Sequence, residues 1–116
     1  MKAIEDLDVF KKAHDVTLSI YGITSQYPKE ETYGLVSQMR RAALSINSNL
    51  IEGGARNTSG ELKQFIGIAR GSAAELKYQI MLSKDLKLVE ATKAKLLEEE
   101  IENIRKMLTG LIKSIK

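Results

Sequence analysis

Apolar residues recur at every third or fourth position in four long segments of the chain, which is the spacing of one face of an α-helix. The first two segments carry Val9, Ala13, Val16, Ile20, Ile23 and Tyr27, and then Leu35, Met39, Ala42 or Ala43, Ile46 and Leu50. The last two carry Leu62, Phe65, Ile66, Ala69, Ala73, Leu76 and Ile80, and then Leu97, Ile101, Ile104, Leu108, Leu111 and Ile115. The pattern predicts four helices. In the last helix, Leu97, Ile101, Ile104, Leu108 and Leu111 should be buried against Val16, Ile20, Met39, Ile46, Phe65 and Leu76.

Helix breakers separate these segments and set the expected connections. Pro28 blocks continuation of the first helix, and the pair Gly53-Gly54 is expected to take the left-handed conformation that ends the second. The run Thr58-Ser59-Gly60-Glu61 fits a capping box, so the third helix should start near residue 59, and a weaker break follows near 87–90. The sequence therefore predicts an all-α fold in which residues 1–116 form one antiparallel up-down-up-down four-helix bundle, with helices of roughly 20 to 28 residues.

Composition removes several classes of function. The 116 residues include 18 Lys and Arg against 15 Asp and Glu, and the formal charge of +3 permits a nucleic-acid partner without requiring one. The chain has no cysteine and one histidine, His14, so thiolate sites and histidine-based zinc sites lack ligands, and we expect no metal and no cofactor. The apolar runs are short and the first residues, MKAIEDL, are acidic, so we expect a soluble cytoplasmic protein without membrane contact.

The candidate catalytic residues of this sequence also lack the partners that catalysis would need. Ser45 has no histidine or lysine near it in the chain, and Glu52 stands alone. The run Gly53-Gly54-Ala55 is not a phosphate loop, because neither a strand before it nor a Gly-Lys-Ser/Thr after it is present. A helical ribonuclease of the HEPN type would need an arginine four to six residues before its histidine, and no arginine precedes His14. We therefore expect no enzymatic activity.

Two of the predicted helices have a second face that is unusual for a monomeric bundle. In the third helix two glycines lie roughly opposite the core stripe, where each costs about 1 kcal/mol relative to alanine. Neutral drift at exposed positions would explain them, but an approach by another helix explains them better, since apolar residues share the face. The first helix has a similar second face, and we expect both to form a homo-oligomer interface through Phe10, His14, Leu18, Tyr21, Gly67, Gly71, Ala74 and Tyr78.

Basic residues recur at seven-residue intervals along the third predicted helix, and none has an acidic residue three or four positions away. They are Lys63, Arg70, Lys77 and Lys84, and Arg40, Arg41 and Arg56 add positive charge near the second helix and its exit loop. This line could contact successive phosphates of a nucleic acid, or it could pair with acidic side chains of a neighbouring helix or subunit. Aromatic residues are few, so contact with the nucleic-acid backbone is expected rather than base stacking.

Four motifs in order along the chain resemble the family of four-helix bundle proteins encoded within intervening sequences of bacterial 23S ribosomal RNA genes. They are Tyr27-Pro28 with Glu30-Glu31, then Gln38, Arg40, Arg41, Ala42 and Ser45, then Asn49 to Gly53, and then Ala69, Gly71, Ser72, Glu75 and Leu76. Tyr27 stands where the family usually has Phe, and Asn47 stands where proline is common. The resemblance implies a ring-shaped homopentamer. It also implies kinship with the accessory variability determinant proteins of diversity-generating retroelements, which are nucleic-acid and reverse-transcriptase partners.

Together these features give one leading functional hypothesis and one alternative. The leading hypothesis is a non-enzymatic oligomer that binds RNA or DNA through backbone phosphate contacts made by the basic residues. The alternative is a structural or protein–protein interaction module without a nucleic-acid role, in which the basic line pairs with acidic groups.

Overall fold

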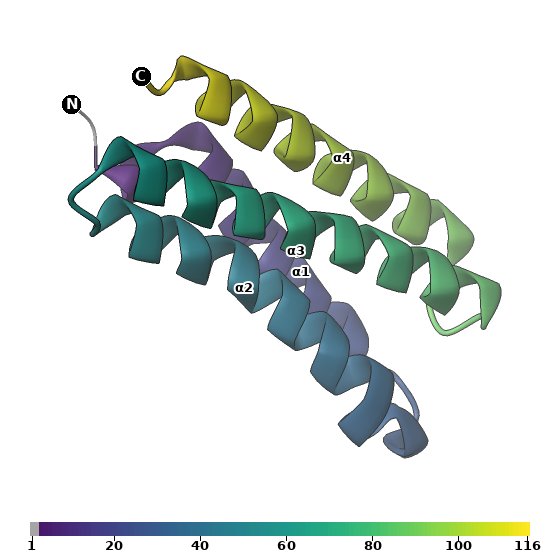
Figure 1. Ribbon diagram of the computed structural model, residues 1–116. Helices are drawn as coiled ribbons and strands as arrows, with labels where there is room; N and C mark the ends of the chain where they lie inside the picture. Colours follow the sequence, from purple (N-terminus) through teal and green to yellow (C-terminus); the bar gives the residue numbers. More distant parts are fainter. Residues whose placement is uncertain (1–2) are drawn as a thin grey trace.

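The computed structural model describes residues 3–116 and contains four long helices packed as a bundle (Figure 1). They are α1 (Asp8–Thr24), α2 (Ser37–Gly54), α3 (Ser59–Asp85) and α4 (Ala91–Ser114). Each helix packs against the next one in the chain and α4 packs against α1, so α1 and α3 lie on opposite corners. This confirms the predicted four-helix bundle. With 17 and 18 residues, α1 and α2 are shorter than expected, whereas α3 has 27 and α4 has 24.

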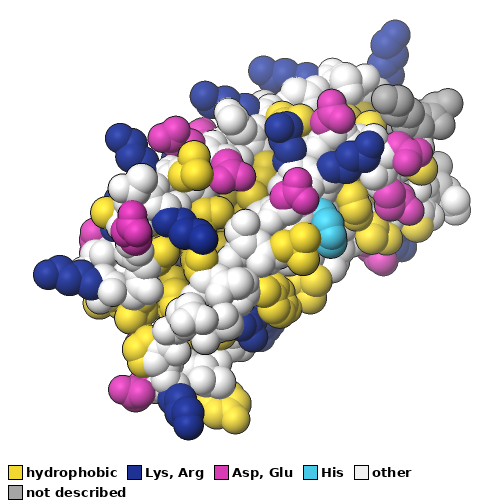
Figure 2. Space-filling view, turned by 180° about the vertical axis from the view of Figure 1, so that it is seen from behind, with side chains coloured by type: hydrophobic (Ala, Val, Ile, Leu, Met, Phe, Trp, Pro, Cys, Tyr) yellow, Lys and Arg dark blue, Asp and Glu magenta, His cyan; other side chains and the backbone are white. Residues whose placement is uncertain are grey.

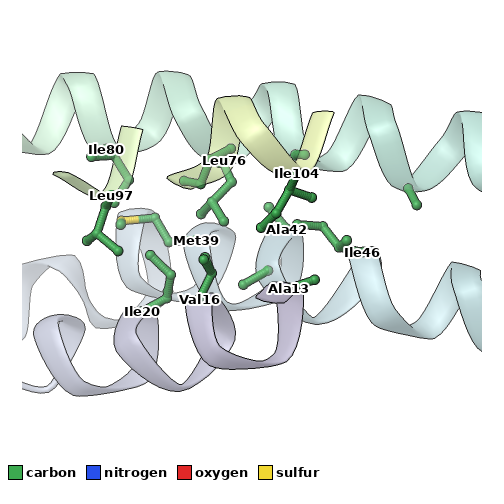
Figure 3. Packing of buried hydrophobic residues seen from close by; sticks show 14 of the residues in the cluster. Ala13, Val16, Ile20, Met39, Ala42, Ile46, Leu76, Ile80, Leu97 and Ile104 are labelled. Carbon is green, nitrogen blue, oxygen red and sulfur yellow. The ribbon is translucent and has the colours of Figure 1, made fainter. Parts of the chain in front are cut away.

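The predicted apolar stripes meet in one core along the axis of the bundle. Met39, Ile46, Leu76, Ile101 and Ile104 are completely buried, and Figure 3 shows side chains from all four helices meeting there. Two side chains differ from the expectation. Leu111 is half-buried because it lies near the open end of the bundle, and Phe65 is half-buried because it faces α2 at the edge of the core.

The connection between α2 and α3 corrects one prediction and refines another. Helix α2 ends at Gly54, as predicted, but both glycines are helical and no described glycine has a positive φ, so the left-handed conformation predicted for this helix end is wrong. Gly53 is required for packing instead, because a Cβ atom there would lie 2.9 Å from Cβ of Phe65. The predicted capping box is confirmed in part. The Thr58 hydroxyl accepts a hydrogen bond from the Glu61 amide at 3.1 Å, but the Glu61 carboxylate accepts from the Thr58 hydroxyl and not from a backbone N–H.

The other two connections end the helices by different means. Between α1 and α2, Pro28 precedes a short 3₁₀ turn at Lys29–Glu31 and a π-helical turn at Thr32–Val36, where Gly34 has non-helical backbone angles. Between α3 and α4, Lys87 takes a positive φ of 62° and reverses the chain. A further 3₁₀ turn at Ile4–Asp6 precedes α1. No helix among the described residues is both long enough and apolar enough to cross a bilayer.

The buried apolar side chains of α4 should contribute most of the stability of the bundle. Replacing the completely buried Ile104 by Ala should lower the free energy of unfolding by about 2 to 5 kcal/mol, because the truncation leaves a cavity between four helices. The matched control is Leu96→Ala on the same helix, where the side chain is 59% exposed and truncation should change little. Chemical denaturation measures the free energy of unfolding of both variants. Equal denaturation midpoints would contradict the burial of the apolar stripe of α4.

Candidate functional site

Three of the four basic residues with seven-residue spacing on α3 make contacts with α4, and they remain partly exposed. Arg70 donates to the Thr109 hydroxyl at 3.2 Å, Lys77 pairs with Glu102 at 3.0 Å, and Lys84 pairs with Glu98 at 3.2 Å. We call this row of three contacts the α3/α4 polar seam. The structure thus supplies the acidic partners on a neighbouring helix that the sequence left open as one alternative. The heptad spacing produced this row because residues seven apart return to the same side of a helix.

Glu102 is the centre of the seam. Its carboxylate accepts hydrogen bonds from Lys77 at 3.0 Å and from Arg105 at 2.8 Å. These bonds hold the pKa of Glu102 below its ordinary value, because both cations stabilise the charged form. The side chains of Lys77 and Glu102 are each about one-third exposed, so the pair is screened by water and contributes little to stability. Both side chains therefore keep part of their surface in contact with water.

The remaining candidate cations lie on other surfaces. Arg40 reaches α1, where it donates to the Thr24 hydroxyl at 2.9 Å and lies over the Tyr21 ring. Arg56 pairs with Glu52 at 2.7 Å and lies over the Phe65 ring. Arg41 is exposed and Lys63 is half-buried, and neither has an ion-pair partner among residues 3–116. The seven predicted cations therefore do not form one continuous patch.

The second face of α1 is exposed, as expected, and it continues onto α2. His14 and Tyr21 are exposed and Leu18 is 59% exposed, whereas Phe10 is half-buried; hydrophobic side chains surround the single histidine in Figure 2. Leu44 and Ile51 of α2 are also about half exposed. We define the apolar face of α1 and α2 as Phe10, His14, Leu18, Tyr21, Leu44 and Ile51.

Sequence reasoning missed the contribution of α2 to this face, although a signal was present. Leu44 and Ile51 are seven residues apart and lie outside the core stripe of α2. Their relation to α1 depends on how the helices pack: Asn47 donates to the Phe10 carbonyl at 3.0 Å and Thr17 donates to the Ala43 carbonyl at 3.3 Å. These bonds join the two helices along one edge, and the apolar residues lie on the outside of that edge.

The outer face of α3 carries the two glycines that motivated the interface prediction. A Cβ atom built at Gly67 or Gly71 would meet no heavy atom within 4 Å, so packing within the chain does not require glycine at either position. Tyr78 on the same helix is 60% exposed, and Ile68 and Met81 are also exposed. We call this surface the glycine face of α3. It differs from the glycine pair of α2, where Gly53 makes close contacts within the chain.

The polar residues considered for catalysis have structural contacts. The hydroxyls of Ser45 and Ser72 lie 2.8 Å apart between α2 and α3, and Asn49 donates to Ser45 at 2.9 Å. Glu52 is the partner of Arg56. The described residues bring no three acidic, histidine or cysteine side chains together as a metal site. The hydroxyl contact holds two small side chains between closely packed helices.

Comparison with known proteins places these surfaces in a family context. The sequence pattern of the family described as 23S rRNA-intervening sequence protein matches residues 5–110. Among solved structures, a protein with unknown function from the S23 ribosomal protein family of Bacteroides thetaiotaomicron superimposes with a TM-score of 0.84 at 20% sequence identity, over 91% of this chain and 96% of that one. At this identity the superposition shows a shared fold. No curated protein has a matching sequence.

Proposed function

This chain belongs to the 23S rRNA-intervening sequence protein family, and we propose that it is a non-enzymatic protein that assembles into a ring and binds RNA or DNA through phosphate contacts. The observation that carries the proposal is the pair of unpartnered surfaces on opposite corners of the bundle: the apolar face of α1 and α2, and the glycine face of α3. Assembly is the first part of the proposed function, and nucleic-acid binding depends on it.

Two different faces on opposite sides of one subunit favour a ring. When one face of a subunit meets the other face of the next, the contact is head-to-tail, and repetition closes a ring if the rotation is suitable. The glycine face offers space for close approach, since nothing within the chain occupies it at Gly67 or Gly71. The apolar face offers side chains such as Leu18 and Leu44, which are each more than half exposed in the single chain. A ring of five is the closed form that we propose, following the family resemblance.

Assembly would multiply weak phosphate contacts. One chain has a formal charge of +3, and each additional copy repeats the same cations around the ring axis. Backbone contacts that are individually weak become useful when several act together on one nucleic acid. Lys63 and Arg41 have no ion-pair partner among residues 3–116, and Lys77 and Arg70 are partly exposed. These four residues are the phosphate contacts that we propose.

A second candidate is favoured by the α3/α4 polar seam itself. Lys77 and Lys84 already have acidic partners on α4, which is the arrangement expected of a structural or protein–protein interaction module. In that case the cations fix the packing of two helices and carry no nucleic-acid role. The two candidates differ in what happens when the acidic partner is removed while the lysine is kept.

The assembly should depend on the glycine face. Gly71→Leu should convert the oligomer to smaller species, because the new side chain blocks approach of the next subunit, whereas a Cβ atom at this position meets no packed neighbour in its own chain within 4 Å. Gly110→Leu on α4 is the matched control, since a Cβ atom there also meets nothing within 4 Å. Light scattering after size exclusion measures the mass. A mass near 12.9 kDa for the unmodified protein at micromolar concentration would refute the assembly.

Phosphate binding should depend on the cations and not on their acidic partners. The double variant Arg70→Gln/Lys77→Gln should weaken binding to unrelated RNA sequences. The slope of the logarithm of the RNA association constant against the logarithm of the salt concentration should become shallower by about two, because two phosphate contacts are lost. Glu102→Gln breaks the same helix contact but keeps Lys77, so it should bind RNA as well as the unmodified protein or better. Fluorescence titration at two salt concentrations measures both variants.

The pair of variants also separates the two candidates. If neither the double variant nor Glu102→Gln changes the affinity or its salt dependence, helix α3 does not contact phosphate and the structural role is favoured. If both variants weaken RNA binding and also reduce the oligomer mass, the α3/α4 polar seam affects RNA binding through its effect on assembly. Mass and affinity are therefore measured on the same samples.

A further inference from the structure

The first described residues, the α2–α3 connection and the C-terminal end of α4 lie at the same end of the bundle (Figure 1). Residues of these three segments line a cavity there. Its volume is about 700 Å³, within the range of small-molecule binding sites. Most of its wall is apolar, and the side chains on that wall are half-buried residues at the margin of the core together with the fully buried Ile66. They are Ile4, Leu7, Leu62, Ile66, Leu111 and Ile115.

The charged side chains that line the cavity are cationic, although one of them, Arg56, pairs with Glu52 beside the rim. Arg56 and Lys116 line it, and no aspartate or glutamate is among the described residues of its wall. Arg56 donates through one terminal nitrogen to Glu52 and lies over Phe65, which orients the guanidinium and leaves further N–H groups to donate. Asn57 and Thr58 of the α2–α3 connection add polar groups beside Arg56. The cavity thus combines an apolar wall with a cationic rim.

We propose that this cavity binds a single aliphatic chain that ends in a carboxylate, such as a medium-chain fatty acid. The aliphatic chain lies against the isoleucine and leucine side chains, and the carboxylate accepts hydrogen bonds at the rim from Arg56 and Lys116. Arg56 already pairs with Glu52 at 2.7 Å, so a purely apolar ligand would leave Lys116 and the remaining N–H groups of Arg56 without an acceptor. A compact polar anion would leave the apolar wall in water. This binding site is independent of the proposed assembly and of phosphate binding.

The ligand class is tested by calorimetric titration of the whole protein with octanoate, decanoate and dodecanoate below their micelle concentrations. Affinity should rise about tenfold for each two added methylene groups, because each buried methylene contributes to transfer from water. The neutral 1-decanol should bind about tenfold more weakly than decanoate, since it makes no charge-assisted hydrogen bond. Failure of all three carboxylates to saturate would overturn the proposal, and equal affinity for decanoate and 1-decanol would overturn the role of the rim.

Two matched pairs of variants locate the site. Ser114 lines the cavity and donates to the carbonyl three residues before it, and Ser25 makes the same local bond at the opposite end of the bundle. Ser114→Phe should fill the cavity and abolish decanoate binding, whereas Ser25→Phe should leave it unchanged. Circular dichroism verifies that each variant is folded. Decanoate binding that survives in folded Ser114→Phe would place the ligand elsewhere and overturn the proposal.

The second pair, Arg56→Gln and Glu52→Gln, isolates the rim charge, and Lys116→Gln tests the other rim cation. Arg56→Gln should weaken decanoate binding about tenfold, and Lys116→Gln, beyond the last turn of α4, should weaken it without disturbing the fold. Glu52→Gln breaks the same ion pair but keeps the cation, so it should bind decanoate at least as tightly as the unmodified protein. Equal losses in Arg56→Gln and Glu52→Gln would show that the ion pair, and not the cation, is needed, and would overturn the carboxylate contact at Arg56.

Discussion

The close approach of α2 and α3 is the constraint on which the rest of this structure depends. It is possible because small residues lie between the two helices: Gly53 leaves no room for a Cβ atom beside Phe65, and the hydroxyls of Ser45 and Ser72 meet at 2.8 Å. Buried alanines are also present on both helices. The large apolar side chains of all four helices meet in one continuous core (Figure 3).

The same arrangement determines which surfaces are left for function. With α2 on one side of α3 and α4 on the other, the heptad-spaced cations of α3 face α4 and find Glu98, Glu102 and Thr109. The opposite side of α3 presents Gly71 and Tyr78 to solvent. A cation row and a glycine row on one helix therefore have different environments, although the sequence shows them on the same segment. This separation lets assembly and phosphate binding be tested by different substitutions.

The ends of the bundle are also consequences of helix packing. Helix α1 is 17 residues long and α3 is 27, so the four helices do not cover one another completely at both ends. At the end where α2 turns into α3, half-buried side chains such as Leu62 and Leu111 form a wall without full cover. The result is a cavity at the margin of the core and not within it. Its apolar wall and cationic rim come from segments far apart in the chain.

The sequence by itself determined the four helices, their apolar stripes, the cap at Thr58 and the family, because each of these is set by local spacing or local motif. Tertiary structure decided what each outward residue meets. The sequence showed that Lys77 has no acidic residue three or four positions away on its own helix, but the partner Glu102 is 25 residues away and is reached only once α4 packs beside α3.

Likewise, Gly53 was interpreted as a helix end, whereas its role depends on contact with Phe65. Leu44 and Ile51 form one apolar face with Leu18 only because α1 and α2 lie side by side. Periodicity fixes the side of a helix on which a residue lies, and packing alone fixes what that side faces.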